Sequence, residues 1–393
     1  MASSSTPAAP KILLAKPASV PAGSSVAKFA RSEDESVLLR SRLPPVNLLS
    51  DSWDFHTDRI LPFLTDNTDF TVIGVIGPPG AGKSTIMNEL YGFDGSSPGM
   101  LPPFATQSEE TRAMARHCTM GIELRISTER LILLDTQPIF SPSVLAEMMR
   151  PDGSSAISVL NGESLSADLA HELMGIQLGV FLASICHVLL VISEGVHDIN
   201  MWHLMLTVDL LKHGIPDPSL LSPNTQSSNL GPDKDNKDNS SENNEEFLAD
   251  PVFVYTKLQE SDLHPRKITK LKAALSQYFS SSSFCRIEHA ISSKEESSHN
   301  VKNRNNTGLM DQSLFLLPTK VQDDSQRAQY RSYMSMLGQL RDQILSMNSH
   351  TFTKSISERD WLKSTARIWD LVKKSPVIAE YSKTLQASGQ FRR

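Results

Sequence analysis

The stretch Gly77-Pro78-Pro79-Gly80-Ala81-Gly82-Lys83-Ser84 decides the fold, because it fits G-x-x-x-x-G-K-[ST] at every fixed position. The β-branched, apolar residues 70–76 precede it and predict a buried strand. Residues 85–90 follow it with apolar side chains at helical spacing. Strand, glycine loop and helix together favour a phosphate-binding loop over a glycine turn with a surface lysine.

Each residue type in this stretch suits phosphate chemistry. The glycines allow successive backbone N–H groups to face an anion, and the following helix points its positive end at the same place. Lys83 adds a charge for the terminal phosphates, and the Ser84 hydroxyl is a ligand for magnesium. The candidate phosphate-binding residues are Gly77, Gly80, Ala81, Gly82, Lys83, Ser84 and Thr85.

Composition limits the classes of function. The chain has 393 residues, of which 39% are hydrophobic and 21% charged, with a net charge of −6. A negative chain has no general attraction to nucleic acid or to anionic membranes, so we expect neither as a direct partner. No apolar run approaches the length of a membrane span. The three cysteines show no metal-binding pattern, which favours a reducing compartment.

The chain reads as one large domain with disordered additions. Residues 1–35 are rich in Ser, Ala and Pro; they loosely resemble an organellar transit peptide, but one arginine and several prolines favour a disordered tail. We expect a domain over 36–375 with disordered insertions near 222–246 and 292–308, and a tail over 376–393. The expected location is the cytoplasm, with nuclear presence left open.

Strands and helices alternate after the loop. A strand over 118–126 turns in a hairpin into the apolar run 130–136, which contains Asp135 near its carboxyl end. Further strands are predicted at 186–192, 252–257 and 314–318, and helices at 165–181, 198–212, 265–278 and 323–347. This order predicts an α/β fold of the P-loop NTPase class: a doubly wound, mostly parallel sheet with helices on both faces.

Other positions distinguish three kinds of phosphate-loop enzyme. A small-molecule kinase needs an arginine-rich lid, and none is evident in the sequence. An AAA-type ATPase needs Asp followed by Glu at the end of the second strand, and here Asp135 is followed by Thr136. A GTPase places a threonine on the preceding strand, and Thr119 stands there. The GTPase-like fold therefore fits best.

The parts that hydrolysis and guanine recognition need are degenerate. Asp-x-x-Gly is replaced by Asp135-Thr136-Gln137-Pro138, so proline stands where a glycine N–H would meet the γ-phosphate. Ile139 stands at the position of the water-orienting glutamine, and Asn-Lys-x-Asp is replaced by Thr256-Lys257-Leu258-Gln259. We therefore assign no catalytic residue and expect a bound nucleotide without turnover; an active ATPase or GTPase switch is the alternative.

Four segments carry a resemblance to a known family. The run 131–139, with Ser141-Pro142 after it, together with Tyr255-Thr256-Lys257 and Phe315-Leu316-Leu317-Pro318, resembles the SMG-nine family of nonsense-mediated mRNA decay factors. The resemblance covers about residues 45–375. It implies a GTPase-like domain that pairs with SMG-eight, joins the kinase SMG-one as a regulatory or scaffold subunit and acts with SMG-eight to control its activity. The link to the helicase UPF-one is indirect.

The resemblance also implies a bound purine nucleotide, ATP/ADP or GTP/GDP, with Mg²⁺. Carried onto this chain, Ser84, Asp135 and Thr119 would hold the metal, and Lys257 would lie near the base through its methylene stem. Trp361 and Trp369 are eight residues apart on a predicted helix, so they form a protein interface if exposed and pack on the core if buried.

Overall fold

The computed structural model describes residues 46–93, 101–149, 165–196, 198–221, 246–284, 314–320, 332–347 and 349–389. All of them lie within one compact unit, Arg42–Arg393. The predicted tail 1–35 and the insertion 292–308 lie outside the described residues, as does the insertion 222–246 except for Glu246.

The core is a seven-stranded sheet, as far as the described residues go, with strand order β1-β3-β4-β2-β5-β6-β7. Strands β4, β2, β5, β6 and β7 run parallel, whereas β3 is antiparallel to β4 and β1 is antiparallel to β3. The strands are β1 (Val46–Leu49), β2 (Thr71–Ile76), β3 (Ile122–Ile126), β4 (Leu131–Thr136), β5 (Val188–Glu194), β6 (Asp250–Leu258) and β7 (Leu314–Pro318). The predicted mostly parallel sheet and its β3–β4 hairpin are confirmed.

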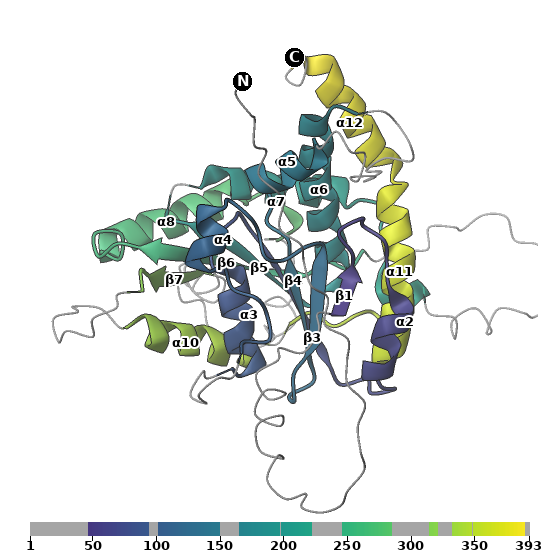
Figure 1. Ribbon diagram of the computed structural model, residues 1–393, viewed down its shortest axis with the longest axis horizontal. Helices are drawn as coiled ribbons and strands as arrows, with labels where there is room; N and C mark the ends of the chain where they lie inside the picture. Colours follow the sequence, from purple (N-terminus) through teal and green to yellow (C-terminus); the bar gives the residue numbers. More distant parts are fainter. Residues whose placement is uncertain are drawn as a thin grey trace, which may run out of the picture. The chain divides into compact units, whose positions relative to one another are not determined.

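Helices cover both faces of the sheet (Figure 1). Helices α3 (Lys83–Tyr91) and α10 (Tyr333–Ser346) share one hydrophobic cluster with one set of strand side chains. Helices α6 (Ala167–Ile185), α7 (Ile199–Leu211) and α11 (Glu358–Lys373) share a larger cluster with the opposite set. The other helices are α2 (Thr57–Ile60), α4 (Glu109–Ala113), α5 (Pro142–Met148), α8 (Pro265–Tyr278) and α12 (Pro376–Ser388), with short 3₁₀ turns at Leu61–Phe63 and Pro218–Leu221.

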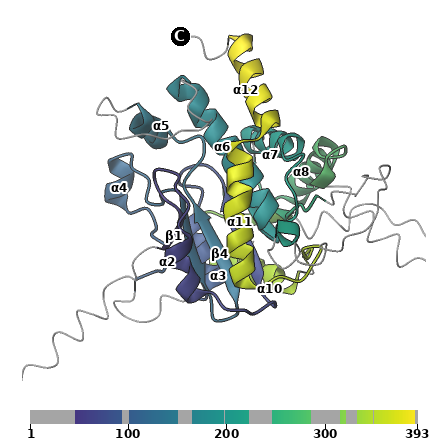
Figure 2. The same ribbon diagram turned by 90° about the vertical axis from the view of Figure 1, so that its right-hand side faces the viewer.

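Helix α6 is the central helix of the larger cluster. Every residue from Leu173 to Ile185 is buried, because α6 packs on the sheet and also contacts α7 and α11 (Figure 2). At Gly179 a Cβ would lie 2.5 Å from Val208 Cγ2, so the missing side chain lets α7 approach closely. A helix buried on several sides explains why its sequence is apolar all round rather than amphipathic.

The two tryptophans of α11 are core residues, so the interface hypothesis for them is wrong. Trp361 and Trp369 are 0% and 1% exposed. The Trp361 indole N–H donates to the Ile185 carbonyl at 3.0 Å, and the Trp369 ring contacts Phe181 and Trp53 at centroid distances of 5.1 and 5.2 Å. Both rings fasten α11 to the sheet domain.

The C-terminal end differs from the expectation. Helix α12 occupies Pro376–Ser388, where the sequence predicted a tail. The Ser375 hydroxyl caps it by accepting from the Ile378 N–H at 3.4 Å, and Pro376 stands in the first turn, where its missing N–H costs nothing. No helix in the described ranges combines the length and the hydropathy that crossing a membrane requires.

Candidate functional site

The glycine loop lies between the end of β2 and the start of α3. Gly80 and Gly82 have φ angles of +72° and +97°, which residues with a side chain rarely adopt. At Gly77, a Cβ would lie 2.5 Å from the Ile192 carbonyl oxygen of the neighbouring strand. The loop thus needs glycine for two separate reasons: positive φ at two positions and close backbone approach at the third.

Lys83 is folded back onto the loop. Its Nζ donates to the carbonyl oxygens of Gly77 at 3.0 Å and Pro78 at 2.9 Å, and the residue is 7% exposed. Burial lowers the pKa of this ammonium to about 8, partly offset by the nearby Asp135 carboxylate. A buried cation held only by neutral carbonyls has unused capacity for an anion.

Ser84, Thr119 and Asp135 meet at the base of the loop. Asp135 Oδ2 accepts from Ser84 Oγ at 2.7 Å and from Thr119 Oγ1 at 2.9 Å. The other carboxylate oxygen, Oδ1, is buried and has no hydrogen-bond partner. Burial raises the Asp135 pKa to about 6 against the opposing effects of the Ser84 hydrogen bond and the Lys83 charge. The three residues predicted as metal ligands are therefore brought together.

This donor set fits magnesium. Mg²⁺ prefers hard oxygen ligands, keeps several waters and uses one or two carboxylates. One buried carboxylate with an unpaired oxygen and two hydroxyls matches that preference. The described residues contain no group of three or more His, Cys, Asp or Glu side chains placed to hold a metal ion.

A pocket of about 130 Å³ opens beside these residues. Its wall comes from three parts of the chain: the loop with the start of α3, the segment 105–119, and the end of β4. The lining residues are Pro79, Gly80, Gly82, Lys83, Ser84, Thr85, Ala105, Thr106, Gln107, Arg112, His117, Cys118, Thr119, Thr136 and Pro138. The lining contains Lys83, Arg112 and His117 but no carboxylate, so its charge suits an anion.

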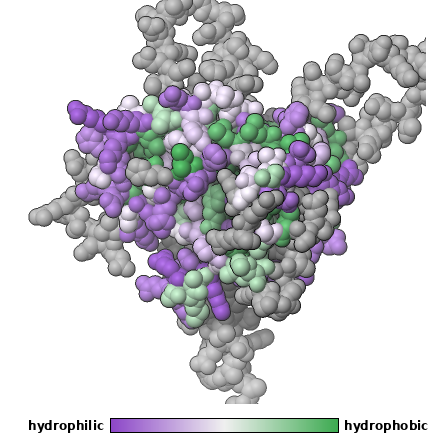
Figure 3. Space-filling view, turned by 90° about the horizontal axis from the view of Figure 1, so that it is seen from above, coloured by the Kyte–Doolittle hydropathy of each residue, from purple (hydrophilic) through white to green (hydrophobic). Residues whose placement is uncertain are grey.

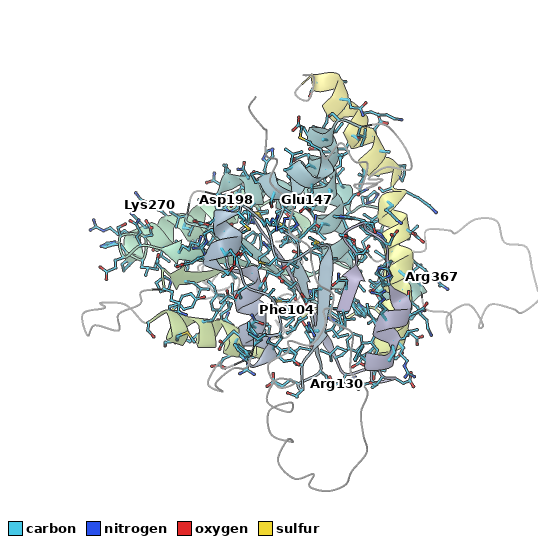
Figure 4. All side chains as sticks on the ribbon, in the orientation of Figure 1. Phe104, Arg130, Glu147, Asp198, Lys270 and Arg367 are labelled. Carbon is cyan, nitrogen blue, oxygen red and sulfur yellow. The ribbon has the colours of Figure 1, made fainter. Side chains whose placement is uncertain are left out.

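The segment 101–119, called the strap below, is fastened at both ends. At one end the buried Phe104 exchanges two backbone hydrogen bonds with the Asn88 side chain of α3, at 2.8 and 3.0 Å. Figure 4 labels Phe104 near the middle of the view, and its side chain is 0% exposed. At the other end, Thr119 bonds to Asp135. Between them, His117 hydrogen-bonds with Ser143 Oγ of α5 at 2.9 Å.

The residues after Asp135 are turned away from the pocket or lack the groups for catalysis. Gln137 is 5% exposed; its Oε1 accepts from the Gly121 N–H at 3.0 Å, and its Nε2 faces Met174 Sδ. Pro138 lines the pocket without an N–H to offer. Ile139 is buried and packs near Gly175.

Lys257 lies beside the loop but is not among the pocket-lining residues. A Cβ on Gly80 would lie 3.8 Å from its Nζ, which pairs with Glu194 Oε2 at 2.7 Å. The backbone of Lys257 has a φ of +56°, at a register shift between β6 and β7. The preceding Thr256 donates its hydroxyl to the Ala81 carbonyl at 2.8 Å and so fixes the loop to β6.

Sequence reasoning missed four residues that build the site: Asn88, Gln107, Arg112 and His117. Asn88 was discoverable, since it is a polar residue on the apolar face of α3, one turn after Ser84. The other three belong to a strap without periodicity, so no pattern placed them at the pocket.

A scan against models of known protein families finds no match for the chain. Curated proteins do match. Nonsense-mediated mRNA decay factor SMG9 of Xenopus laevis is 30% identical over 385 residues, which cover 87% of this chain and 68% of the relative. The protein of the same name from Xenopus tropicalis is 29% identical over 376 residues with the same coverage, and that of Caenorhabditis briggsae is 39% identical over 89 residues, or 23% of each chain. This chain belongs to the family of nonsense-mediated mRNA decay factor SMG9.

Proposed function

We propose that this chain acts in nonsense-mediated mRNA decay as a subunit whose phosphate loop holds a Mg²⁺–purine nucleotide without turning it over. Family membership supports the pathway. The observation that carries nucleotide binding is the meeting of Ser84, Thr119 and Asp135 beneath a glycine loop, with one buried carboxylate oxygen unpaired. An unpaired buried charge is costly unless a ligand completes it.

Each residue has a place in the proposed complex. The backbone N–H groups of the loop would face the phosphates, and Lys83 would exchange its two loop carbonyls for phosphate oxygens. Ser84 and Thr119 would ligate magnesium, with Asp135 acting through a metal-bound water. The metal, when bound, neutralises phosphate charge. Lys257 would lie near the base.

Three features support a nucleotide that is held rather than consumed. Gln137 is committed to the Gly121 N–H and lies outside the pocket lining. Pro138 removes an N–H that would meet the terminal phosphate. His117, a titratable side chain in the lining, has one ring nitrogen bonded to Ser143 and the other 3.6 Å from Glu147. Neither Gln137 nor Pro138 therefore offers a group that would orient water at a terminal phosphate, and both ring nitrogens of His117 face groups of α5.

The proposed partners are SMG-eight, as the other half of a heterodimer, and the kinase SMG-one, with UPF-one affected indirectly, all in the cytoplasm. Exposed methionines support a protein-binding surface near the pocket: Met114 follows α4, Met120 precedes β3 and Met149 follows α5, with exposures of 54%, 42% and 64%. Figure 3 shows hydrophobic patches among hydrophilic side chains when the molecule is seen from above. Methionine suits adaptable interfaces.

The test is to denature the purified protein and identify the released nucleotide by chromatography. We expect a purine nucleotide in wild-type protein and none in Lys83→Ala. Lys363→Ala is the matched control, since Lys363 is an exposed lysine on α11. Binding of added Mg²⁺–nucleotide is measured in parallel by calorimetry. An empty wild-type protein that also binds neither ATP nor GTP would contradict the proposal.

One observation favours the alternative, an NTPase switch. The strap joins the metal triad through Thr119, so a change in bound phosphate would reach the whole segment. A switch predicts different protease cleavage within 104–119 for di- and triphosphate complexes. Identical cleavage patterns would contradict the switch and favour a nucleotide that is bound without turnover.

A further inference from the structure

We infer that Arg112 binds the terminal phosphate of the nucleotide, so that the site prefers a nucleoside triphosphate over the corresponding diphosphate. The inference rests on the proposed function, because it assigns a further residue to the same site. It names the phosphorylation state of the ligand, which neither the loop nor the metal triad determines.

The first support is the charge of the pocket. Its lining includes the Lys83 ammonium and the Arg112 guanidinium but no carboxylate. Asp135 lies beneath the lining and is already paired with two hydroxyls close to Lys83. Arg112 is therefore a second cation in the pocket lining. Glu109 and Glu110 stand in the same helix, but neither lines the pocket, so the lining suits a ligand more negative than a diphosphate with magnesium.

The second support is that Arg112 is uncommitted. Within the described ranges its side chain makes no hydrogen bond and no ion pair, and it is exposed at the pocket wall. The other polar strap residues in the lining are engaged: His117 bonds Ser143, and Gln107 Nε2 donates to the Arg116 carbonyl at 3.0 Å. A guanidinium with free donors is well suited to bidentate hydrogen bonding with phosphate oxygens.

The third support is position. Arg112 is carried by α4, which the Ser108 hydroxyl caps by accepting from the Thr111 N–H at 3.2 Å. No residue of α4 is buried, so contacts outside the helix must fix its position. These are the hydrogen bond of Phe104 to Asn88 before the helix and the Gln107–Arg116 hydrogen bond across the strap. These contacts hold Arg112 at the pocket without tying up its side chain.

The strap reaches the residues that would hold the metal. Magnesium bound there would neutralise charge on the terminal phosphates. Thr119, the strap residue that contacts Ser84 and Asp135, would therefore place the strap near that end of a bound nucleotide. Arg112 is the positively charged strap residue in the lining, and Arg116 is not part of the lining.

The test uses full-length Arg112→Ala, Arg112→Lys and, as the matched control, Arg116→Ala. Calorimetry with Mg²⁺ measures the affinities of a non-hydrolysable triphosphate and a diphosphate, each with adenine and with guanine. We expect Arg112→Ala to weaken triphosphate binding about tenfold to hundredfold and to leave diphosphate binding within about threefold, with partial rescue by lysine and no effect of Arg116→Ala.

Two results would overturn the inference: equal losses for tri- and diphosphate in Arg112→Ala, or no loss at all. Since Arg112 is exposed on a helix without buried residues, the variant should fold, which circular dichroism checks. Lys83→Ala separates the two proposals. If wild-type protein binds nucleotide through Lys83, but Arg112→Ala does not weaken triphosphate binding more than diphosphate binding, only this inference fails. If wild-type protein binds no nucleotide, both proposals fail.

Discussion

At the scale of single residues, the site is a pair of opposite charges held in an unfavourable environment. Lys83 and Asp135 are both buried, and burial favours the neutral form of each. It lowers the pKa of Lys83 to about 8 and raises the pKa of Asp135 to about 6. Desolvation is the largest cause of both shifts, and shifted pKa values are common at functional sites. A phosphate beside Lys83 and a divalent cation beside Asp135 would stabilise the charged forms.

Replacing Asp135 by Asn tests the metal site. The variant removes a buried charge, so the free protein should gain stability, on the order of 1–3 kcal/mol at pH 7. Magnesium should no longer increase nucleotide affinity. Urea unfolding and calorimetry with and without Mg²⁺ measure the two effects. Retained magnesium dependence in Asp135→Asn would exclude Asp135 as a metal-side group.

The pH dependence of the same residue has opposite signs for stability and for binding. The folded pKa of Asp135, about 6, lies above its ordinary value of 3.8, so the folded state holds the extra proton between these values. The Asp135 contribution to stability therefore falls as pH rises from about 4 to about 6. Magnesium-dependent nucleotide affinity should rise over the upper part of that range, because only the carboxylate attracts the cation.

The measurement compares wild-type protein with Asp135→Asn from pH 5 to 7.5. The unfolding free energy of wild-type protein relative to Asp135→Asn should fall as pH rises toward about 6, as expected when Asp135 loses one proton. Nucleotide affinity should drop below about pH 6 in wild-type protein only. Parallel pH profiles for the two proteins would show that another group governs the response.

At the scale of elements, the glycine loop was predictable in detail and the strap was not. The motif, the apolar strand before it and the helix after it are local signals, and β2, the loop and α3 follow them. The strap depends on contacts between residues 16 apart, as between Asn88 and Phe104, and periodicity carries no trace of them. Its residues Arg112 and His117 reach the pocket only through that folding.

Two loop glycines should respond differently to alanine. Gly77→Ala places a Cβ 2.5 Å from the Ile192 carbonyl, so β2 and β5 must separate, at a cost of about 1–3 kcal/mol in unfolding free energy. Gly82→Ala meets no atom within 4 Å but keeps a φ of +97°, which costs about 1–2 kcal/mol of backbone strain.

Crystal structures, nucleotide affinities and urea unfolding of the two variants distinguish their effects. Gly77→Ala should shift the strand ends, whereas Gly82→Ala should shift only the loop and reduce affinity more than stability. An unchanged loop with full affinity in Gly82→Ala would contradict the conformational role assigned to this glycine.

At the scale of the whole described domain, the end of the sheet opposite the pocket is tied together by a buried carboxylate. Glu358 at the start of α11 is 0% exposed; it accepts from the Thr65 N–H at 2.7 Å and pairs with Arg130. Figure 4 places Arg130 at the far end of the sheet from Glu147, which contacts the pocket residue His117. No sequence pattern joined these distant residues.

Glu358→Ala should lower the unfolding free energy by about 1–3 kcal/mol, because it removes the buried acceptor that the Thr65 amide and the Arg130 guanidinium share. Asp66→Ala is the matched control: its exposed pair with Arg359 joins the same two segments, and its loss should cost at most about 1 kcal/mol. Equal losses in the two variants would show that burial does not set the strength of this contact.

The sequence thus predicted the fold more completely than the roles of single side chains. The mostly parallel sheet and the core helices follow from periodicity, as α8 does at Pro265–Tyr278. Cys186, which precedes the apolar run of β5, is buried. The roles of Trp361 and Trp369 could not be decided beforehand, because spacing alone does not say whether a helical face meets solvent or core.

The central claim is that the site holds its nucleotide intact. The most direct measurement follows release of phosphate from ATP and GTP, with Mg²⁺, by purified protein over many hours and relative to the amount of bound nucleotide. The account predicts stoichiometric nucleotide binding by wild-type protein, with less than one phosphate released per site and no more phosphate released than by Lys83→Ala, which should bind no nucleotide. Multiple turnovers that Lys83→Ala abolishes would contradict it.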